Sequence, residues 1–371
     1  MRKVIVGLLL LMLPLAGYGQ TVVEMGIDQL LNLVTAVADT LISDGVDAAA
    51  EVLAQPAAAA GTDSLSVVEH RQQSFPLSVP AGNYSGIAYL GGGRYAVVND
   101  KSDTDGFHLF AIDVDTLSGE LMNVRHEGFV SSGQPNRDGE GIAYVPLTHS
   151  LFISGERDNE VLEYTMEGQL TGRRLAVPAE FKTAKRNYGL ESLTYNAQTH
   201  RFWTTSESTL PADGQQATTA LRVRNRLRLQ SFDDNLQPAA QYFYEMDEPS
   251  VSKSASTYAL GVSELCAMDD GRLIVMEREF YVPSGKLGSF VVNKLYLVNP
   301  DTAAAGAAVD KQLLLRFRTT LALFSYGLAN YEGMCLGPRL ADGRQVLVLI
   351  SDSQNQYKGV LKDWFKTVVI Q

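Results

Sequence analysis

The sequence is short of cysteine and of positive charge. Its 371 residues include two cysteines, Cys266 and Cys335, so no disulfide framework holds the fold. The two form either one bridge or a pair of buried thiols. Lysine and arginine number 31 against 42 aspartates and glutamates, and the net charge is −11. Nucleic-acid binding rests on basic patches that neutralise phosphates, so this balance argues against a nucleic-acid partner.

Signatures of several common catalytic sites are also missing. The five histidines show no H-E-x-x-H or other metal-ligand spacing. The stretch "GVSEL" lacks the closing glycine of a nucleophile elbow, and the chain has no P-loop or dinucleotide fingerprint. Any chemistry must therefore come from other residue types.

No apolar run reaches the ~20 residues that a membrane helix needs. Residues 1–19 combine Arg2 and Lys3 with an apolar stretch at 4–15 and a small-x-small motif at 17–19, as a secretory signal peptide does. No cysteine follows the apolar stretch, so a lipid anchor is not expected. We expect a periplasmic or extracellular protein that has no membrane span and acts as a monomer.

Residues 20–63 differ in sequence pattern from the rest of the chain. Apolar residues recur at helical spacing between Ile27 and Ile42, and an alanine-rich stretch follows. This pattern predicts a helical arm and a linker that serve as a packing arm or a tether. The alternative is a helix that binds a partner. From residue 64 onward, short β-type runs alternate with Gly, Asp and Asn turns. The main domain is therefore predicted at 64–371.

A short pattern occurs five times within that domain. The copies are "SGIAYL" from Ser85, "EGIAYV" from Glu140, "ESLTYN" from Glu191, "ELCAMD" from Glu264 and "EGMCLG" from Glu332. Each copy is followed by a strand-like run with an acid at its far end. These acids are Asp100, Glu156, Glu207, Glu277 and Asp352. The tyrosines at Tyr89, Tyr144 and Tyr195 repeat at one strand position, which favours packing over substrate stacking.

Two further strand-like runs follow most of the copies, which gives four antiparallel strands per unit. Such a repeat predicts an all-β fold, a β-propeller of four-stranded blades. We predict five blades; six would require an irregular blade in one of the longer gaps. The last copy lacks a fourth strand-like run, whereas residues 64–79 contain an additional strand-like run that belongs to no copy. We therefore expect the N-terminal strand to close the last blade, which leaves no open sheet edge.

Inner strands of a propeller line its channel, so the first residue of each copy should converge on one mouth. Like charges gathered there must be protonated, paired or bound to a cation. Ca²⁺ accepts about 6–8 oxygen ligands with flexible geometry, whereas Mg²⁺ keeps more of its waters, so Ca²⁺ is the expected cofactor. The predicted metal ligands are Ser85, Glu140, Glu191, Glu264 and Glu332.

A second ring of acids should surround the first, with cations beside it. We predict the general base among Glu156, Glu207, Glu277 and Asp352. Lys101, Arg157, Arg186 and Arg278 are predicted to bind substrate. A metal beside several Lys and Arg side chains suits a small phosphorylated or carboxylated ligand. In the alternative interpretation, these charges are structural ion pairs of the scaffold.

The same stretches resemble the phytase-like domain family, described as having esterase-like activity of phytase. The resemblance covers roughly residues 75–356. Its strongest pieces are N-x-G-[FL]-E ending at Glu191, the Glu-Arg pair at Glu277 and Arg278, and N-x-E-G-M ending at Met334. The chain departs from the family pattern at Ser192, usually Gly, and at Glu279, where a Gly often follows.

This resemblance implies a secreted bacterial propeller that hydrolyses phosphoester or ester bonds. The arrangement is also similar to that of calcium-activated nucleotidases, five-bladed propellers with axial Ca²⁺ held by Ser and Glu. Two classes of function stay open at this point. One is a metal-dependent hydrolase, and the other is a non-catalytic propeller that binds a surface glycan or a protein and has a structural axial cation.

Overall fold

A computed structural model describes residues 65–322 and 325–371 of the protein. The signal peptide predicted at 1–19 and the arm and linker predicted at 20–63 lie outside the described residues. The described part is built almost entirely of strands, with three short 3₁₀ turns at Ala179–Thr183, Pro300–Thr302 and Tyr357–Gly359. None of the described helices is long and apolar enough to cross a bilayer.

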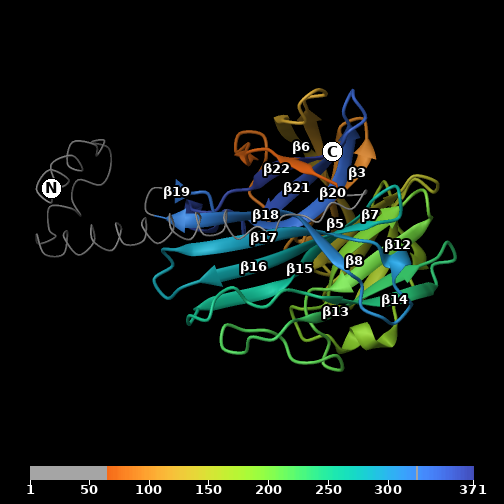
Figure 1. The fold of residues 1–371 in the computed structure, drawn as a ribbon. Helices are drawn as coiled ribbons and strands as arrows, with labels where there is room; N and C mark the ends of the chain where they lie inside the picture. The colour runs from red at the N-terminus through yellow and green to blue at the C-terminus, as the bar shows by residue number, and fades with distance from the viewer. Residues whose placement is uncertain (1–64, 323–324) are drawn as a thin grey trace, which may run out of the picture. The chain divides into compact units, whose positions relative to one another are not determined.

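The described strands form five antiparallel sheets, the blades of a propeller (Figure 1). Blade 1 contains β3 (Tyr84–Gly91), β4 (Arg94–Asn99), β5 (Thr104–Val114) and β6 (Leu121–Pro135). Blade 2 contains β7 (Gly139–Val145), β8 (Ser150–Gly155), β9 (Glu160–Thr165) and β10 (Leu170–Arg174). Blade 3 contains β11 (Leu190–Asn196), β12 (Arg201–Ser206), β13 (Arg226–Phe232) and β14 (Pro238–Glu245).

Blade 4 contains β15 (Thr257–Ala267), β16 (Leu273–Val282), β17 (Ser289–Val298) and β18 (Lys311–Ala322), with β19 (Ser325–Tyr326) paired to the end of β18. Blade 5 contains β20 (Asn330–Arg339), β21 (Gln345–Asp352) and β22 (Trp364–Ile370), together with β1 (Val67–Glu69) and β2 (Gln73–Ser74). The prediction of a five-bladed all-β propeller is confirmed. The strands of blade 4 are longer than most of the others, as Figure 1 shows.

The inner strands β3, β7, β11, β15 and β20 touch one another in sequence order, and β20 touches β3, which closes the ring. Their backbones approach so closely that there is a steric reason for the small second residue found in four of the five copies. A Cβ at Gly86 would lie 2.4 Å from the carbonyl oxygen of Glu140, and one at Gly333 would lie 2.2 Å from that of Ser85. Heavy atoms cannot approach to these distances, so a side chain at either position would push the blades apart.

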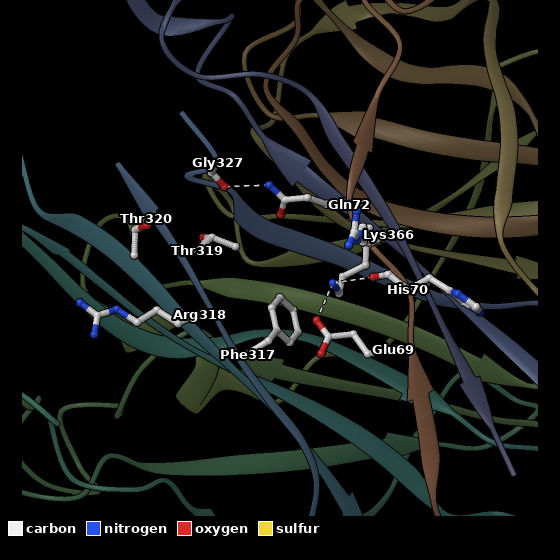
Figure 2. Close-up of a pocket in the computed structure, with 10 residues that line it drawn as sticks. Glu69, His70, Gln72, Phe317, Arg318, Thr319, Thr320, Gly327 and Lys366 are labelled. Atoms are coloured by element: carbon white, nitrogen blue, oxygen red, sulfur yellow. Dashed lines mark hydrogen bonds and ion pairs between the residues drawn. The ribbon is translucent and has the colours of Figure 1, made fainter. Parts of the chain in front are cut away.

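The N-terminal strand closes the last blade, as predicted. Strand β1 pairs with β22 from Val67 opposite Ile370, and β2 pairs with the same strand. Figure 2 shows how Lys366 fastens this closure: its Nζ lies 2.6 Å from Glu69 Oε1 and donates at 2.8 Å to the carbonyl oxygen of His70. The groove in that view, about 550 Å³ in volume, runs between β18 and the closing strand, in the outer part of blades 4 and 5.

The tyrosines that repeat in the sequence belong to the packing between strands. The Tyr89 ring lies 4.9 Å from that of Tyr95, and Tyr195 lies 4.6 Å from Phe202. Both tyrosines are near the ends of their inner strands, away from the repeated acids. Cys266 and Cys335 are buried free thiols.

Candidate functional site

Four of the five residues that begin the copies, Ser85, Glu140, Glu191 and Glu332, meet at one end of the channel. Ser85 Oγ donates to Glu332 Oε2 at 3.4 Å, which connects blades 1 and 5. The Glu264 carboxylate of blade 4 accepts from the backbone N–H of Leu193 in blade 3 at 3.2 Å. Glu140 and Glu191 are both buried. The expected convergence is therefore present for Ser85, Glu140, Glu191 and Glu332. The Glu264 carboxylate is instead bound by backbone N–H groups of Leu193 and Leu265.

A β-bulge includes the starting residue of four copies, and in the copy that begins at Glu264 it falls one residue earlier, at Ser263. The register between the first two strands of every blade shifts there. The shifts fall between Tyr84 and Ile87, Gly139 and Ile142, Leu190 and Ser192, Val262 and Glu264, and Tyr331 and Gly333. A bulge inserts one extra residue into a strand and re-aims the side chains beside it. The repeated pattern in the sequence thus marks a repeated bulge, which the spacing of residues did not reveal.

Arg278 lies among these acids and is almost fully buried. Its guanidinium donates to Glu207 Oε1 at 2.5 Å, to Glu332 Oε1, and to Asn330 Oδ1 at 3.1 Å. The residue opposite Arg278 in register is Gly261, where a Cβ would lie 2.6 Å from Glu207 Cγ. Gly261 therefore leaves the room that the ion pair needs. The sequence analysis placed Arg278 with the substrate-binding residues and missed Asn330 and Gly261.

Glu277 does not join the other acids. Its carboxylate accepts from Tyr244 Oη at 2.8 Å and from Lys311 Nζ at 2.6 Å, and it is 2 % exposed. Lys311 also pairs with Asp247 at 2.9 Å. Successive side chains of a strand point to opposite faces, so Arg278 faces the axis while Glu277 faces blade 3. The structure thus places Glu277 outside the second ring in which the sequence analysis grouped it.

Three acids of the second ring lie where the described structure opens to solvent. Glu156 accepts from the N–H of Gly189 at 3.2 Å, and Asp352 accepts from the N–H of Gln354 at 2.6 Å. Asp100 pairs with Lys101. All three acids are partly exposed, whereas Glu207 is buried against Arg278. A group that must reach water or substrate is therefore better sought among the partly exposed acids than at Glu207.

The predicted cationic residues occupy different positions. Arg157 holds Asp138 with two nitrogens, at 3.0 Å and 3.2 Å, and Lys101 reaches the same carboxylate at 3.8 Å. Both cations are more than half exposed at the mouth. Arg186 is exposed on the loop between blades 2 and 3. Asp138, which orients Arg157, was missed, although it stands two residues before Glu140 in "DGEG".

We name eight carboxylates the axial acid cluster. They are Asp100, Glu140, Glu156, Glu191, Glu207, Glu264, Glu332 and Asp352. Burial raises the pKa of every member, and nearby carboxylates raise the pKa of Glu140 and Glu191 further. The pKa of Asp100 rises to about 6, chiefly through burial. Among the described residues, Arg278 and Lys101 are the cations that pair directly with this cluster.

The donors of the cluster match the chemistry of a hard divalent cation. Glu264 Oε2 and Asp100 Oδ1 are buried without a hydrogen-bond partner, so each has an oxygen that nothing in the described structure satisfies. Carboxylate and hydroxyl oxygens are the ligands that Ca²⁺ prefers. Within residues 65–322 and 325–371, no three Asp, Glu, His or Cys side chains are already gathered at metal-binding distance. The side chains would have to move inward to bind a cation.

Fold and site together define a five-bladed β-propeller with an acidic cluster at one mouth of its channel. The chain belongs to the phytase-like family, described as "Esterase-like activity of phytase", whose model matches residues 79–354. This agrees with the resemblance seen in the sequence. No curated protein matches the chain in sequence.

Several solved structures resemble the chain at low identity. A streptogramin B lyase structure has 10% identity over 82% of this chain and 98% of its own, with a TM-score of 0.37. A luciferin-regenerating enzyme has 10% identity over 82% and 95%, with a TM-score of 0.41. An endo-arabinase from Bacteroides thetaiotaomicron VPI-5482 has 11% identity over 80% and 96%, with a TM-score of 0.43. Likenesses this distant carry no argument about activity.

Proposed function

We propose that the protein hydrolyses phosphoester or ester bonds at the axial acid cluster. The observation that carries the proposal is the imbalance of charge: the eight carboxylates of the axial acid cluster have two directly paired cations. A scaffold gains nothing from buried acids that lack partners, because each costs desolvation free energy. Such acids are retained where they bind a cation or transfer protons. Membership of the phytase-like family supports the same reaction class.

A divalent cation, Ca²⁺ in preference to Mg²⁺, is the proposed cofactor. Ser85, Glu140, Glu191 and Glu264 would hold it, with Glu332 shared between the cation and Arg278. When bound, such a cation polarises a phosphoryl or carbonyl oxygen and stabilises the charge that develops there. The guanidinium of Arg278 holds the carboxylates of Glu207 and Glu332 in place by hydrogen bonds.

Asp352 is the strongest candidate for the general base. Burial raises its pKa well above the usual range, and the charge of Glu332 raises it further. A general base must also be within reach of the water or substrate group whose proton it accepts. No Lys or Arg of the described residues forms a salt bridge with Asp352, while its carboxylate is partly exposed. Glu156 is the alternative candidate for the general base. Glu277 is no longer proposed as the base, because Lys311 and Tyr244 bind its carboxylate.

The substrate we propose is a small anionic molecule. Lys101 and Arg157 stand exposed at the mouth, and their charges attract a phosphate or carboxylate toward an otherwise acidic surface. Arg186 lies on a neighbouring exposed loop and remains a candidate for the same role. The signal-peptide pattern of residues 1–19 supports action in the periplasm or outside the cell.

The deciding experiment is a hydrolysis screen of the purified full chain. Aryl phosphate monoesters, diesters, phosphate anhydrides and simple aryl esters are tested with Ca²⁺, with Mg²⁺ and with chelator. We expect calcium-dependent turnover that Asp352→Asn removes and the exposed Glu120→Gln preserves. If calcium-loaded protein cleaves none of these bonds, the hydrolase proposal fails. The propeller is then better explained as a module that binds a glycan or a protein.

A further inference from the structure

Two lysines stand without a carboxylate partner at the rim of the mouth. Lys286 lies in the turn between β16 and β17, and Lys358 lies in the loop that follows β21. Among the described residues, no Asp or Glu forms a salt bridge with either lysine.

Both lysines converge instead on the side chain of Tyr357. Lys286 Nζ donates to Tyr357 Oη at 2.9 Å, and it lies 5.0 Å from the centre of the ring. Lys358 Nζ lies 5.3 Å from the same ring. The nearby ammonium groups of Lys286 and Lys358 both lower the pKa of Tyr357. The three groups therefore form one small cluster, made by two different blades.

This cluster has more hydrogen-bond donors than acceptors. An ammonium group has three N–H donors and no acceptor, and the phenol oxygen that accepts from Lys286 still has its own hydrogen to donate. After the contacts with Tyr357, several N–H groups and the phenol hydrogen remain. Tyr357, Lys286 and Lys358 are all exposed. An anion with several oxygens would satisfy these donors, and charge-assisted hydrogen bonds to such groups are strong.

The cluster lies on the same side of the propeller as the axial acid cluster. Strand β16 continues past Arg278 to Val282, a rise of about 13 Å at ~3.3 Å per residue, and Lys286 lies in the turn beyond. The loop that carries Tyr357 begins directly after Asp352, the proposed base. The cluster thus lies beside the mouth, where the long strands of blade 4 meet the adjoining loop of blade 5.

The backbone on both sides of this contact is held in an uncommon conformation. Lys286 has a φ of 60°, and Gln354, Asn355, Gln356 and Lys358 all have φ near +50°. Residues other than glycine seldom adopt this left-handed region, and such residues gather at ligand-binding sites. Ser353 and Gln356 anchor the loop through the Asp363 carboxylate, at 2.6 Å and 2.9 Å. The loop is therefore fixed in place by contacts, which keeps its cations presented.

We propose that Lys286, Lys358 and Tyr357 form an anion-binding subsite that holds a second phosphate or carboxylate group of the substrate. This inference rests on the proposed hydrolase function and narrows its substrate class. The preferred substrate has two anionic groups separated by a spacer: one carries the bond cleaved at the axial acid cluster, and the other binds at the rim.

The test compares matched substrates and variants. Alkyl monophosphate, the alkanediol bisphosphate of the same chain length, and the ω-carboxyalkyl phosphate are assayed with wild type, Lys286→Met, Lys358→Met and Tyr357→Phe. We expect each lysine variant to raise KM about tenfold or more for the two-anion substrates and to leave the monophosphate unchanged. The bisphosphate and carboxylate arms show which group the subsite prefers. Arg201→Met removes an exposed cation from the opposite end of β12 and serves as the control.

A second readout needs no turnover. The phenol titration of Tyr357 is isolated as the absorbance difference at 295 nm between wild type and Tyr357→Phe. Inorganic phosphate should raise the pKa of Tyr357 by screening its two lysines, and chloride of equal ionic strength should do so much less. If no substrate is hydrolysed but phosphate shifts this titration, the hydrolase proposal falls and the subsite stands. If phosphate and carboxylates leave the titration unchanged and the lysine variants treat all substrates alike, the subsite is wrong.

Discussion

Arg278 Nη2 lies 2.5 Å from Glu207 Oε1, and this ion pair joins blade 4 to blade 3 at the channel axis. The same guanidinium binds Glu332 of blade 5. One buried side chain therefore ties three of the five blades together at their closest approach. It also supplies the positive charge that two members of the axial acid cluster share.

Replacing Arg278 with Met should destabilise the protein strongly, because Glu207 and Glu332 would stay buried without their counter-ion. Removing one partner of a buried ion pair typically costs about 3–5 kcal/mol. Arg278→Lys should recover part of the loss, since an ammonium cannot reach both carboxylates with the geometry of a guanidinium. Urea unfolding at pH 7 measures the difference, with Arg201→Met as control. A loss below about 1 kcal/mol would show that the acids are already neutral without Arg278.

Calcium should raise the melting temperature and chelator should lower it. A ligand that binds only the native state stabilises it by mass action, by about 2.7 kcal/mol at 100 times its Kd. Glu191→Gln and Glu264→Gln should weaken the response, and Glu163→Gln, whose carboxylate binds Ser150 and Arg173, should not. Calorimetry with and without calcium measures it. Melting that is indifferent to both calcium and chelator would rule out the axial cation.

Asp352→Asn should lower kcat by about 10²–10⁴-fold with little change in folding, as the loss of a general base does. Glu277→Gln should leave kcat within a few-fold and instead reduce stability, because Lys311 loses its charged partner. Steady-state kinetics and thermal melting of both variants separate the two effects. The opposite pattern would return Glu277 to the catalytic set.

The last blade should depend on Lys366. Lys366→Met removes the contacts to Glu69 and to the His70 carbonyl, and buried hydrogen bonds of this kind contribute about 1–3 kcal/mol. Deletion of residues 65–79 should go further and abolish cooperative unfolding, because it exposes the edge of β22. Lys253→Met, at an exposed position, is the control. A deletion variant that stays monomeric and melts like wild type would contradict the role of the closing strand.

Acid should destabilise the protein through a pair of partly buried histidines. His108 Nδ1 lies 2.9 Å from His126 Nε2, and burial lowers the pKa of His108 to about 4. Because the folded pKa lies below the unfolded value of 6.5, this group stabilises the native state above pH 6.5, and the contribution is lost as pH falls toward 4. Relative to His108→Gln, wild type should lose about 2 kcal/mol between pH 7 and pH 4.5. Equal pH profiles for the two proteins would show that His108 titrates normally.

Much of this protein could be predicted from its sequence. The small residue that follows the starting residue in four of the five copies reflects the contact of neighbouring inner strands, as at Gly86 and Gly333. Four β-type runs per repeat are a local property of the chain, so the blade and the count of five follow from them. The incomplete last copy predicted the closing strand, which β1 and β2 supply.

The partners of the charged side chains were decided only by the tertiary structure. Glu277 and Arg278 are neighbours in sequence, yet one faces blade 3 and the other the channel axis. The bulges beside Glu264 and the other starting residues change which side chains point inward, and a register shift of this kind has no signal in residue type. Contacts such as Lys286 with Tyr357 join segments 71 residues apart, so they follow from the closure of the ring and from no local pattern.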